Sequence, residues 1–141
     1  MLFLNQRGDT MCYYIYGALY GDVDKDEYQA LEHKYAYKLR CGTKHNVKLS
    51  VQENSDEYRV TNWCCDCDSS LGKKDPGADQ IKELETLFLD IKCIKGAEYI
   101  YLCKTWSGRR NKREITLKLA DIDLKKVLAE LHENYLYTFE I

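Results

Sequence analysis

Three segments with helical spacing of apolar residues lie along this chain between segments that are typical of strands. Helices are predicted near 24–40, 76–95 and 123–133, because the apolar residues there recur every three to four positions and form a stripe. Of the other segments, 12–20 and 98–106 are apolar runs typical of buried strands, and the rest have the period of two that is typical of a half-buried strand. This alternation favours a fold in which helices pack on a β-sheet.

Six strands are predicted around these helices. One hairpin should join the second and third strands and another the fourth and fifth, so we expect a mostly antiparallel sheet. The order is βαββαββαβ, which begins with the ferredoxin-like pattern, and the class is a single α+β sandwich with three helices on one face of the sheet. The predicted strands cover residues 12–20, 46–52, 57–63, 98–106, 113–120 and 135–141.

The length of 141 residues suits one domain, which we assign to residues 11–141. Residues 1–10 match no predicted element, and the first strand begins directly after Met11. We therefore expect residues 1–10 to be an N-terminal arm, and we hypothesise that the natural protein begins at Met11.

Charge and hydropathy narrow the class of partner and the compartment. The net charge of −2 argues against a general polyanion-binding protein, because affinity for nucleic acid needs accumulated positive charge. No stretch has the length of a membrane-spanning helix, and the N-terminus lacks a signal-peptide pattern. We expect a cytoplasmic protein without membrane contact, in which the seven cysteines are thiols or ligands rather than disulfides.

Three of those cysteines fall within four positions of the segment "NWCCDCDSSLGKKD", residues 62–75. Cys65 and Cys67 could supply two thiolates to a metal ion, and Cys12 is the best candidate for a third if the first strand lies beside this loop. Zinc in a structural site takes four such ligands in tetrahedral array. The pattern is weak evidence for zinc, because the chain has no Cys-x2-Cys pair. Cys41 and His45 are further candidates.

Two other interpretations of this segment remain open. A cysteine just before a helix N-terminus lies in a field that favours the thiolate, so Cys65 or Cys67 could be the nucleophile or redox thiol of an enzyme. No histidine lies near them in the sequence to act as a base, which favours a non-enzymatic site for a metal or for a thiol-based interaction with a protein partner. Alternatively, the segment is a compact turn that packs under Trp63.

The start of the first strand and the cysteine segment carry one resemblance. Met11-Cys12 and the later Cys65-Asp66-Cys67, with Leu71-Gly72 and Ser69 or Ser70, resemble a loose group of uncharacterised bacterial proteins that open with Met-Cys and carry Cys-Asp-Cys-x-Ser/Thr-x-Leu-Gly. Asp68 departs from the glycine expected there. The resemblance covers about the first half of the chain, and it implies a site without implying a reaction.

The segment "KTWSGRRNKR", residues 104–113, is the remaining candidate site. It carries five positive charges and a tryptophan without an acidic residue. Basic and aromatic side chains together can bind phosphate and stack on a base, and Arg109, Arg110, Lys112 and Arg113 would make the phosphate contacts. Because the whole chain is acidic, we expect an exposed hairpin tip that binds nucleic acid only weakly.

Overall fold

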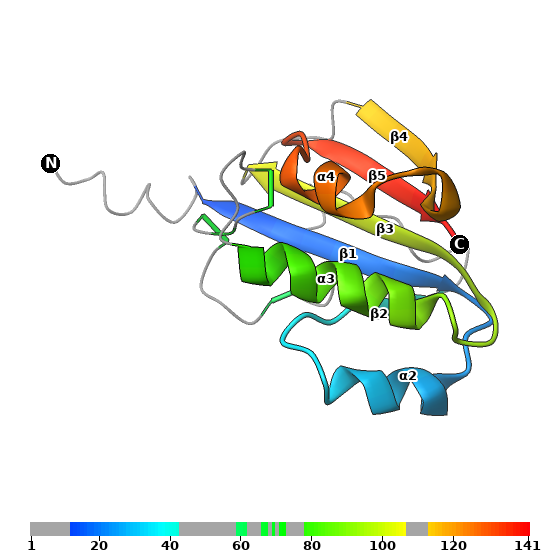
Figure 1. The fold of residues 1–141 in the computed structure, drawn as a ribbon. Helices are drawn as coiled ribbons and strands as arrows, with labels where there is room; N and C mark the ends of the chain where they lie inside the picture. Colours follow the sequence, from blue (N-terminus) through cyan, green and yellow to red (C-terminus); the bar gives the residue numbers. More distant parts are fainter. Residues whose placement is uncertain are drawn as a thin grey trace, which may run out of the picture.

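The structure, a computed structural model, describes residues 12–42, 59–61, 66–67, 69, 71–72, 78–106 and 113–141. Five strands form one mixed sheet in the order β2-β1-β3-β5-β4, and three helices pack against it (Figure 1). The α+β class is therefore confirmed. The elements are β1 (Tyr13–Gly21), α2 (Lys25–Glu32), β2 (Arg40–Gly42), α3 (Ala78–Ile91), β3 (Ala97–Trp106), β4 (Arg113–Lys118), the short 3₁₀ helix η2 (Leu119–Asp121), α4 (Leu124–Ala129) and β5 (Tyr135–Glu140).

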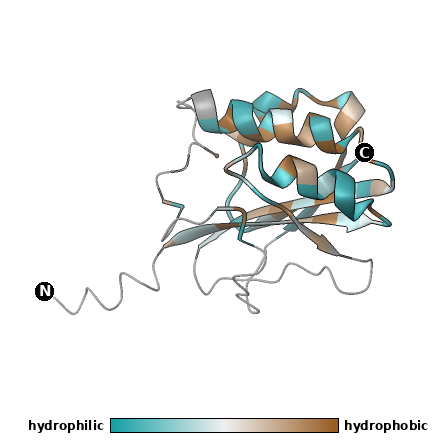
Figure 2. Cartoon of the chain, turned by 90° about the horizontal axis from the view of Figure 1, so that it is seen from below, coloured by the Kyte–Doolittle hydropathy of each residue, from teal (hydrophilic) through white to brown (hydrophobic). Residues whose placement is uncertain are grey.

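One face of the sheet and the three helices enclose the main hydrophobic core, and Figure 2 shows the helices gathered on that side. The strands bury alternate residues here, as their period of two requires. Ile15 and Leu19 of β1 meet Ile100 and Leu102 of β3 in this layer. The other contributors are Tyr137 and Phe139 from β5, Tyr28 from α2, Ile81, Leu84, Leu87, Phe88 and Ile91 from α3, and Leu124 and Leu128 from α4.

The opposite face of the sheet carries most of the tyrosines of the two central strands. Tyr16 is buried there in a smaller cluster with Cys103 and Leu136. Tyr20, Tyr99 and Tyr101 are half-buried. Because residues two apart on a strand share a face, β1 directs Ile15 and Leu19 to the helices and its even-numbered tyrosines, with Ala18, to the other side.

The predicted hairpin between the fourth and fifth strands is wrong. β5 lies between β3 and β4, pairing antiparallel with β3 and parallel with β4, so α4 belongs to a crossover connection between parallel strands. The sheet has two parallel and two antiparallel pairings and is mixed, where we expected it to be mostly antiparallel. The physical reason is burial. β5 has buried residues on both faces of the sheet, which suits an interior strand with a neighbouring strand at each edge. β4 is largely exposed, which suits the edge of the sheet.

The first helix is also shorter than predicted. α2 begins after its N-cap Asp24, as expected, and ends at Glu32 rather than near residue 40. The helical spacing of Leu39 predicted a longer helix, but Leu39 is buried where the chain returns to the core after α2. There its backbone N–H donates to the hydroxyl of Tyr28 at 2.6 Å. Gly42, just beyond the predicted end of this helix, lies in β2, which pairs parallel with β1.

The other two helices match their predicted centres and end early. α3 ends at Ile91 rather than near 95, and α4, whose N-cap is Asp123, ends at Ala129 rather than near 133. The residues that precede α3 lie outside the described part of the chain, as do residues 1–11 and most of the predicted hairpin of 46–63. Within that hairpin, Arg59 forms an isolated antiparallel bridge with Tyr16. None of the described helices is long and apolar enough to span a membrane.

Candidate site at the start of strand β1

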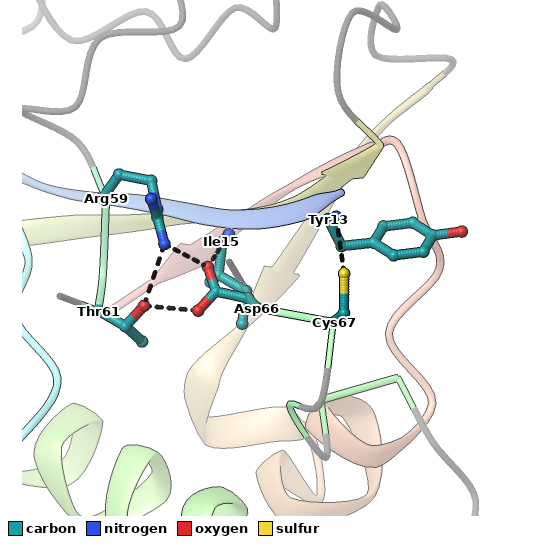
Figure 3. Close-up of polar contacts among 6 residues, drawn as sticks. All are labelled: Tyr13, Ile15, Arg59, Thr61, Asp66 and Cys67. Atoms are coloured by element: carbon teal, nitrogen blue, oxygen red, sulfur yellow. Dashed lines mark hydrogen bonds and ion pairs between the residues drawn. The ribbon is translucent and has the colours of Figure 1, made fainter. Parts of the chain in front are cut away.

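Asp66 attaches the cysteine segment to β1. Its side chain is fully buried, and its carboxylate accepts hydrogen bonds from the backbone N–H of Ile15 at 2.7 Å, the hydroxyl of Thr61 at 2.5 Å and the guanidinium of Arg59 at 3.1 Å (Figure 3). The Asp66 N–H in turn donates to the Tyr13 carbonyl at 2.8 Å. A buried carboxylate is tolerated only when it is paired and hydrogen-bonded in this way.

These contacts complete an edge of β1 that β2 leaves open. β2 pairs only with Ala18, Leu19 and Tyr20, near the end of β1. Toward the start of β1, the Val60 N–H donates to the Ile15 carbonyl at 2.9 Å, and Asp66 supplies the acceptor for the Ile15 N–H. Because an unsatisfied backbone N–H in the interior is costly, this use of a side chain fixes the position of the cysteine segment.

Cys67 lies directly beside the start of β1. Its Sγ accepts a hydrogen bond from the backbone N–H of Tyr13 at 3.4 Å (Figure 3). That nitrogen is bonded to the carbonyl carbon of Cys12, so the Cys67 sulfur lies next to the peptide link between Cys12 and Tyr13. Both cysteines are half-buried. The structure thus places the Cys67 sulfur beside the backbone that joins Cys12 to Tyr13.

The third cysteine of the predicted group, Cys65, lies outside the described residues. Within the described residues, no three His, Cys, Asp or Glu side chains form a group that could hold a metal ion. The five cysteines of this part of the chain form no disulfide. Two half-buried cysteines, Cys12 and Cys67, are therefore held at one strand end. Cys65 precedes Cys67 by two residues in the sequence.

The rest of the motif has structural roles. The buried Ser69 accepts a hydrogen bond from the Leu71 N–H at 3.2 Å, which forms a tight turn, and Leu71 is fully buried in the main core. Gly72 has a φ of +78°, and a Cβ placed there would lie 2.6 Å from the Leu131 carbonyl oxygen. Only glycine adopts this conformation at this distance without strain. Asp66 and these three residues therefore explain the motif as scaffold, and the cysteines are the members left without a core role.

Tyr13 links the cysteine pair to the end of α4 and to β3. Its hydroxyl donates to the Glu133 carboxylate at 2.6 Å, and its ring meets Trp106 edge to face, with centroids 4.4 Å apart. The ammonium of Lys104 lies 5.3 Å from the ring centroid and donates to the Leu71 carbonyl at 2.9 Å. Desolvation, followed by the hydrogen bond to Glu133, raises the pKa of Tyr13 to about 12. The phenol is therefore protonated at neutral pH.

A groove of about 470 Å³ adjoins these residues. Gly72 and Glu133 both contribute to it, so it borders the cysteine segment and Tyr13 alike. Its remaining lining comes from the end of α4 and the start of β5: Ala129, Glu130, Leu131, His132 and Tyr135. A ligand bound at the cysteines would lie beside this groove, whose lining includes the acidic residues Glu130 and Glu133.

The other predicted site residues are spread over the fold. Cys103 is buried, and desolvation raises the pKa of its thiol to about 12, in agreement with a core role. Cys93, which we expected in the core, is exposed because α3 ends before it. Cys41 is half-buried in β2, and its proposed companion His45 lies outside the described residues.

The basic segment 104–113 is not a hairpin tip, because β5 separates its two flanking strands. Lys104, one of its five positive charges, is 5% exposed and points into the structure toward Leu71. Arg113 is exposed at the start of β4. Arg109, Arg110 and Lys112 lie outside the described residues.

Sequence reasoning missed the polar residues that build this site. Asp66 enters the sequence analysis only as a member of the cysteine motif, and Arg59 does not enter it. One usable signal was Lys104, a lysine at an inward-facing position of the apolar strand "EYIYLCKTW". A charge in such a position implies a specific acceptor, although the sequence does not say which.

Comparison with known proteins adds no relative. The chain matches no protein-family model, and it has no match among curated proteins or among solved structures. Any functional argument therefore depends on the residues and geometry described above.

Proposed function

We propose that this protein is a small, non-catalytic cytoplasmic domain that binds a thiophilic metal ion, zinc in the first place, through Cys12 and Cys67 together with Cys65. The observation that carries the proposal is the 3.4 Å hydrogen bond from the Tyr13 N–H to the Cys67 sulfur, since it brings two cysteines that are 55 positions apart in sequence to one strand end. Thiolates are preferred ligands of zinc and of other soft metal ions.

The surroundings of the pair support this chemistry. Hydrogen bonds to the ligands of a metal site orient those ligands, and the Tyr13 N–H contacts the Cys67 sulfur in this way. Asp66 holds the segment rigidly, so the sulfur is positioned before any ligand arrives. The half-buried state of Cys12 and Cys67 leaves them accessible to an ion while limiting access of solvent.

The test is the metal content and affinity of purified protein. We expect about one zinc ion per chain, released when a mercurial reagent titrates the thiols, and a thiolate-to-metal charge-transfer band after replacement of zinc by cobalt. Cys67→Ser should weaken binding at least tenfold, because a serine hydroxyl is a poor ligand for these ions. Cys12→Ser should have an effect of the same order.

Cys93→Ser is the matched control. Cys93 is an exposed thiol beyond the end of α3, and its substitution should leave metal content unchanged. Protein that binds no zinc or cobalt, or binds it equally well after Cys67→Ser, would contradict the proposal. If native Cys67 then proves faster than Cys93 in reaction with a disulfide reagent, the thiol-based alternatives, interaction or redox chemistry, become the better explanation.

A further inference from the structure

A second surface lies at the other end of β1, about 20 Å from Cys67 by the rise of the strand. Here four residues form a row across the sheet on the face away from the helices. Tyr20 of β1 pairs with Tyr99 of β3, Tyr99 pairs with Glu140 of β5, and Glu140 pairs with Lys118 of β4. Figure 1 shows this end of the sheet, where β1 and β5 finish and β3 begins.

The aromatic part of the row is a compact platform. The rings of Tyr20 and Tyr99 are stacked, with centroids 5.3 Å apart and an interplanar angle of 15°. Tyr101 adds a third ring, 6.5 Å from that of Tyr20. All three side chains are half-buried, so part of each ring remains open to solvent. Aromatic faces of this kind attract cations, because the ring quadrupole is negative above the plane.

A groove of about 470 Å³ begins at this platform. The residues that line it with Tyr99 include the acidic Glu98 and Glu140 and the basic Lys118. No hydrogen bond or ion pair engages either carboxylate side chain in the described part of the chain. The remaining lining is apolar and small: Ala97, Ala120 and Ile141. The groove therefore combines an aromatic wall with an excess of negative charge.

We propose that this groove binds an arginine side chain of a partner protein. A guanidinium is planar and weakly hydrated, so it can stack on Tyr99 while it donates hydrogen bonds to a carboxylate such as Glu140. The protein already contains this arrangement on the same face of the sheet, where the guanidinium of Arg59 lies 4.6 Å from the ring centroid of Tyr14 and donates to Asp66. A polyanion such as RNA has the wrong charge for the groove.

The test uses three short capped peptides that differ only in carrying two arginines, two lysines or two glutamates. Binding to the full chain is followed by the backbone amide NMR signals of β3, β4 and β5. The arginine peptide should bind best, the lysine peptide more weakly and the glutamate peptide not at all. Tyr99→Leu should weaken arginine binding between about twofold and thirtyfold, whereas Tyr99→Phe, which keeps the ring, should retain most of it.

Two charge variants test the direction of the effect. Glu140→Gln should weaken binding of the arginine peptide, and Lys118→Gln should strengthen it, because the positive charge of the lysine repels a guanidinium in the same groove. All variants are exposed or half-buried at the sheet surface, and their amide spectra report whether the fold is intact. Equal binding of the three peptides, binding of the glutamate peptide or of oligouridylate in place of the arginine peptide, or an unchanged affinity after Tyr99→Leu in folded protein would overturn the proposal. Cys67→Ser should not alter this binding, so the result is independent of the metal site.

Discussion

At its first residues β1 is held by a buried charge, whereas at its last residues it is held by stacked rings and a short parallel partner. Asp66, with Arg59 and Thr61, replaces a neighbouring strand beside Ile15. Tyr20 instead stacks on Tyr99 and pairs in register with β2. β1 is therefore held in two ways: by specific polar side-chain partners at its start, and by stacked rings and a short neighbouring strand at its end.

The two ends of β1 differ in how much change of geometry they tolerate and in which groups they hold in place. A buried carboxylate has few acceptable geometries, so the segment that carries it is fixed relative to the strand, and the sulfur of Cys67 is fixed with it. Aromatic stacking allows small adjustments and leaves ring faces accessible. The first arrangement suits a ligand site that needs pre-positioned atoms, and the second suits a surface that accepts a side chain.

The largest effect should follow from Asp66→Ala. The substitution leaves the Ile15 N–H without its acceptor and the Arg59 guanidinium without its carboxylate, and we expect a loss of about 3–5 kcal/mol in the free energy of unfolding. Chemical denaturation followed by circular dichroism measures this loss. Asp123→Ala removes an exposed N-cap carboxylate at α4 as a control and should cost only about 1 kcal/mol. Equal losses for the two variants would show that Asp66 is no more than a surface carboxylate.

Gly72→Ala should be the next most damaging change at the same end of the molecule. The φ of +78° is unfavourable for alanine, and its Cβ would approach the Leu131 carbonyl oxygen to 2.6 Å. We expect about 2–3 kcal/mol of destabilisation in the same unfolding experiment, from backbone strain with displacement of α4 added to it. Stability within 0.5 kcal/mol of the parent, by the usual scatter of surface substitutions, would mean that the turn relaxes easily.

At the tyrosine end, Tyr20→Leu should cost only about 1 kcal/mol. Leucine keeps much of the apolar area, and the loss is mainly the stacking on Tyr99, for which aromatic pairs typically contribute about 0.5–1.5 kcal/mol. The double change Tyr20→Leu with Tyr99→Leu completes a mutant cycle that isolates this pair. A coupling as large as the Asp66→Ala loss would remove the distinction between the two ends.

The smallest effect is a change in one titration. Glu133→Gln removes the charge that accepts the Tyr13 hydroxyl, so the pKa of Tyr13 should fall from about 12 toward 10 while remaining raised by desolvation, its largest cause. The neutral phenol is the form that the fold favours: its contribution to stability is complete below pH 10 and is lost as the pH rises from about 10 to 12. In Glu133→Gln, this contribution to stability should be lost over a narrower and lower pH range.

NMR of ¹³Cζ-labelled tyrosine follows this titration residue by residue. Tyr35 is the internal reference, because its pKa is also raised to about 12, but mainly by its hydrogen bond to Asp90 at the end of α3. Its titration should not move in Glu133→Gln. A simultaneous shift of both tyrosines would indicate a general loosening of the fold instead of the loss of one contact.

Much of the secondary structure could be predicted from local sequence, and the site only in outline. The stripe of α3, the cap Asp24 and the apolar runs of β1 and β3 all depend on residues close in sequence. The attachment by Asp66 could not be predicted, because its partners come from two other segments, β1 and residues 59–61. A pattern of residue types does not specify which distant donor a buried carboxylate will meet.

The sequence by itself determined the α+β class, the three helices and the period of the strands, because hydrophobic periodicity acts within each segment. The tertiary structure decided that α2 ends at Glu32, because the chain leaves the helix there and returns to the core, where Leu39 is buried. It also decided that β5 enters between β3 and β4, because a strand with apolar residues on both faces gains more by having two neighbours than β4 does. Competition between segments for the interior of the sheet is a property of the whole chain, and no local pattern records its outcome.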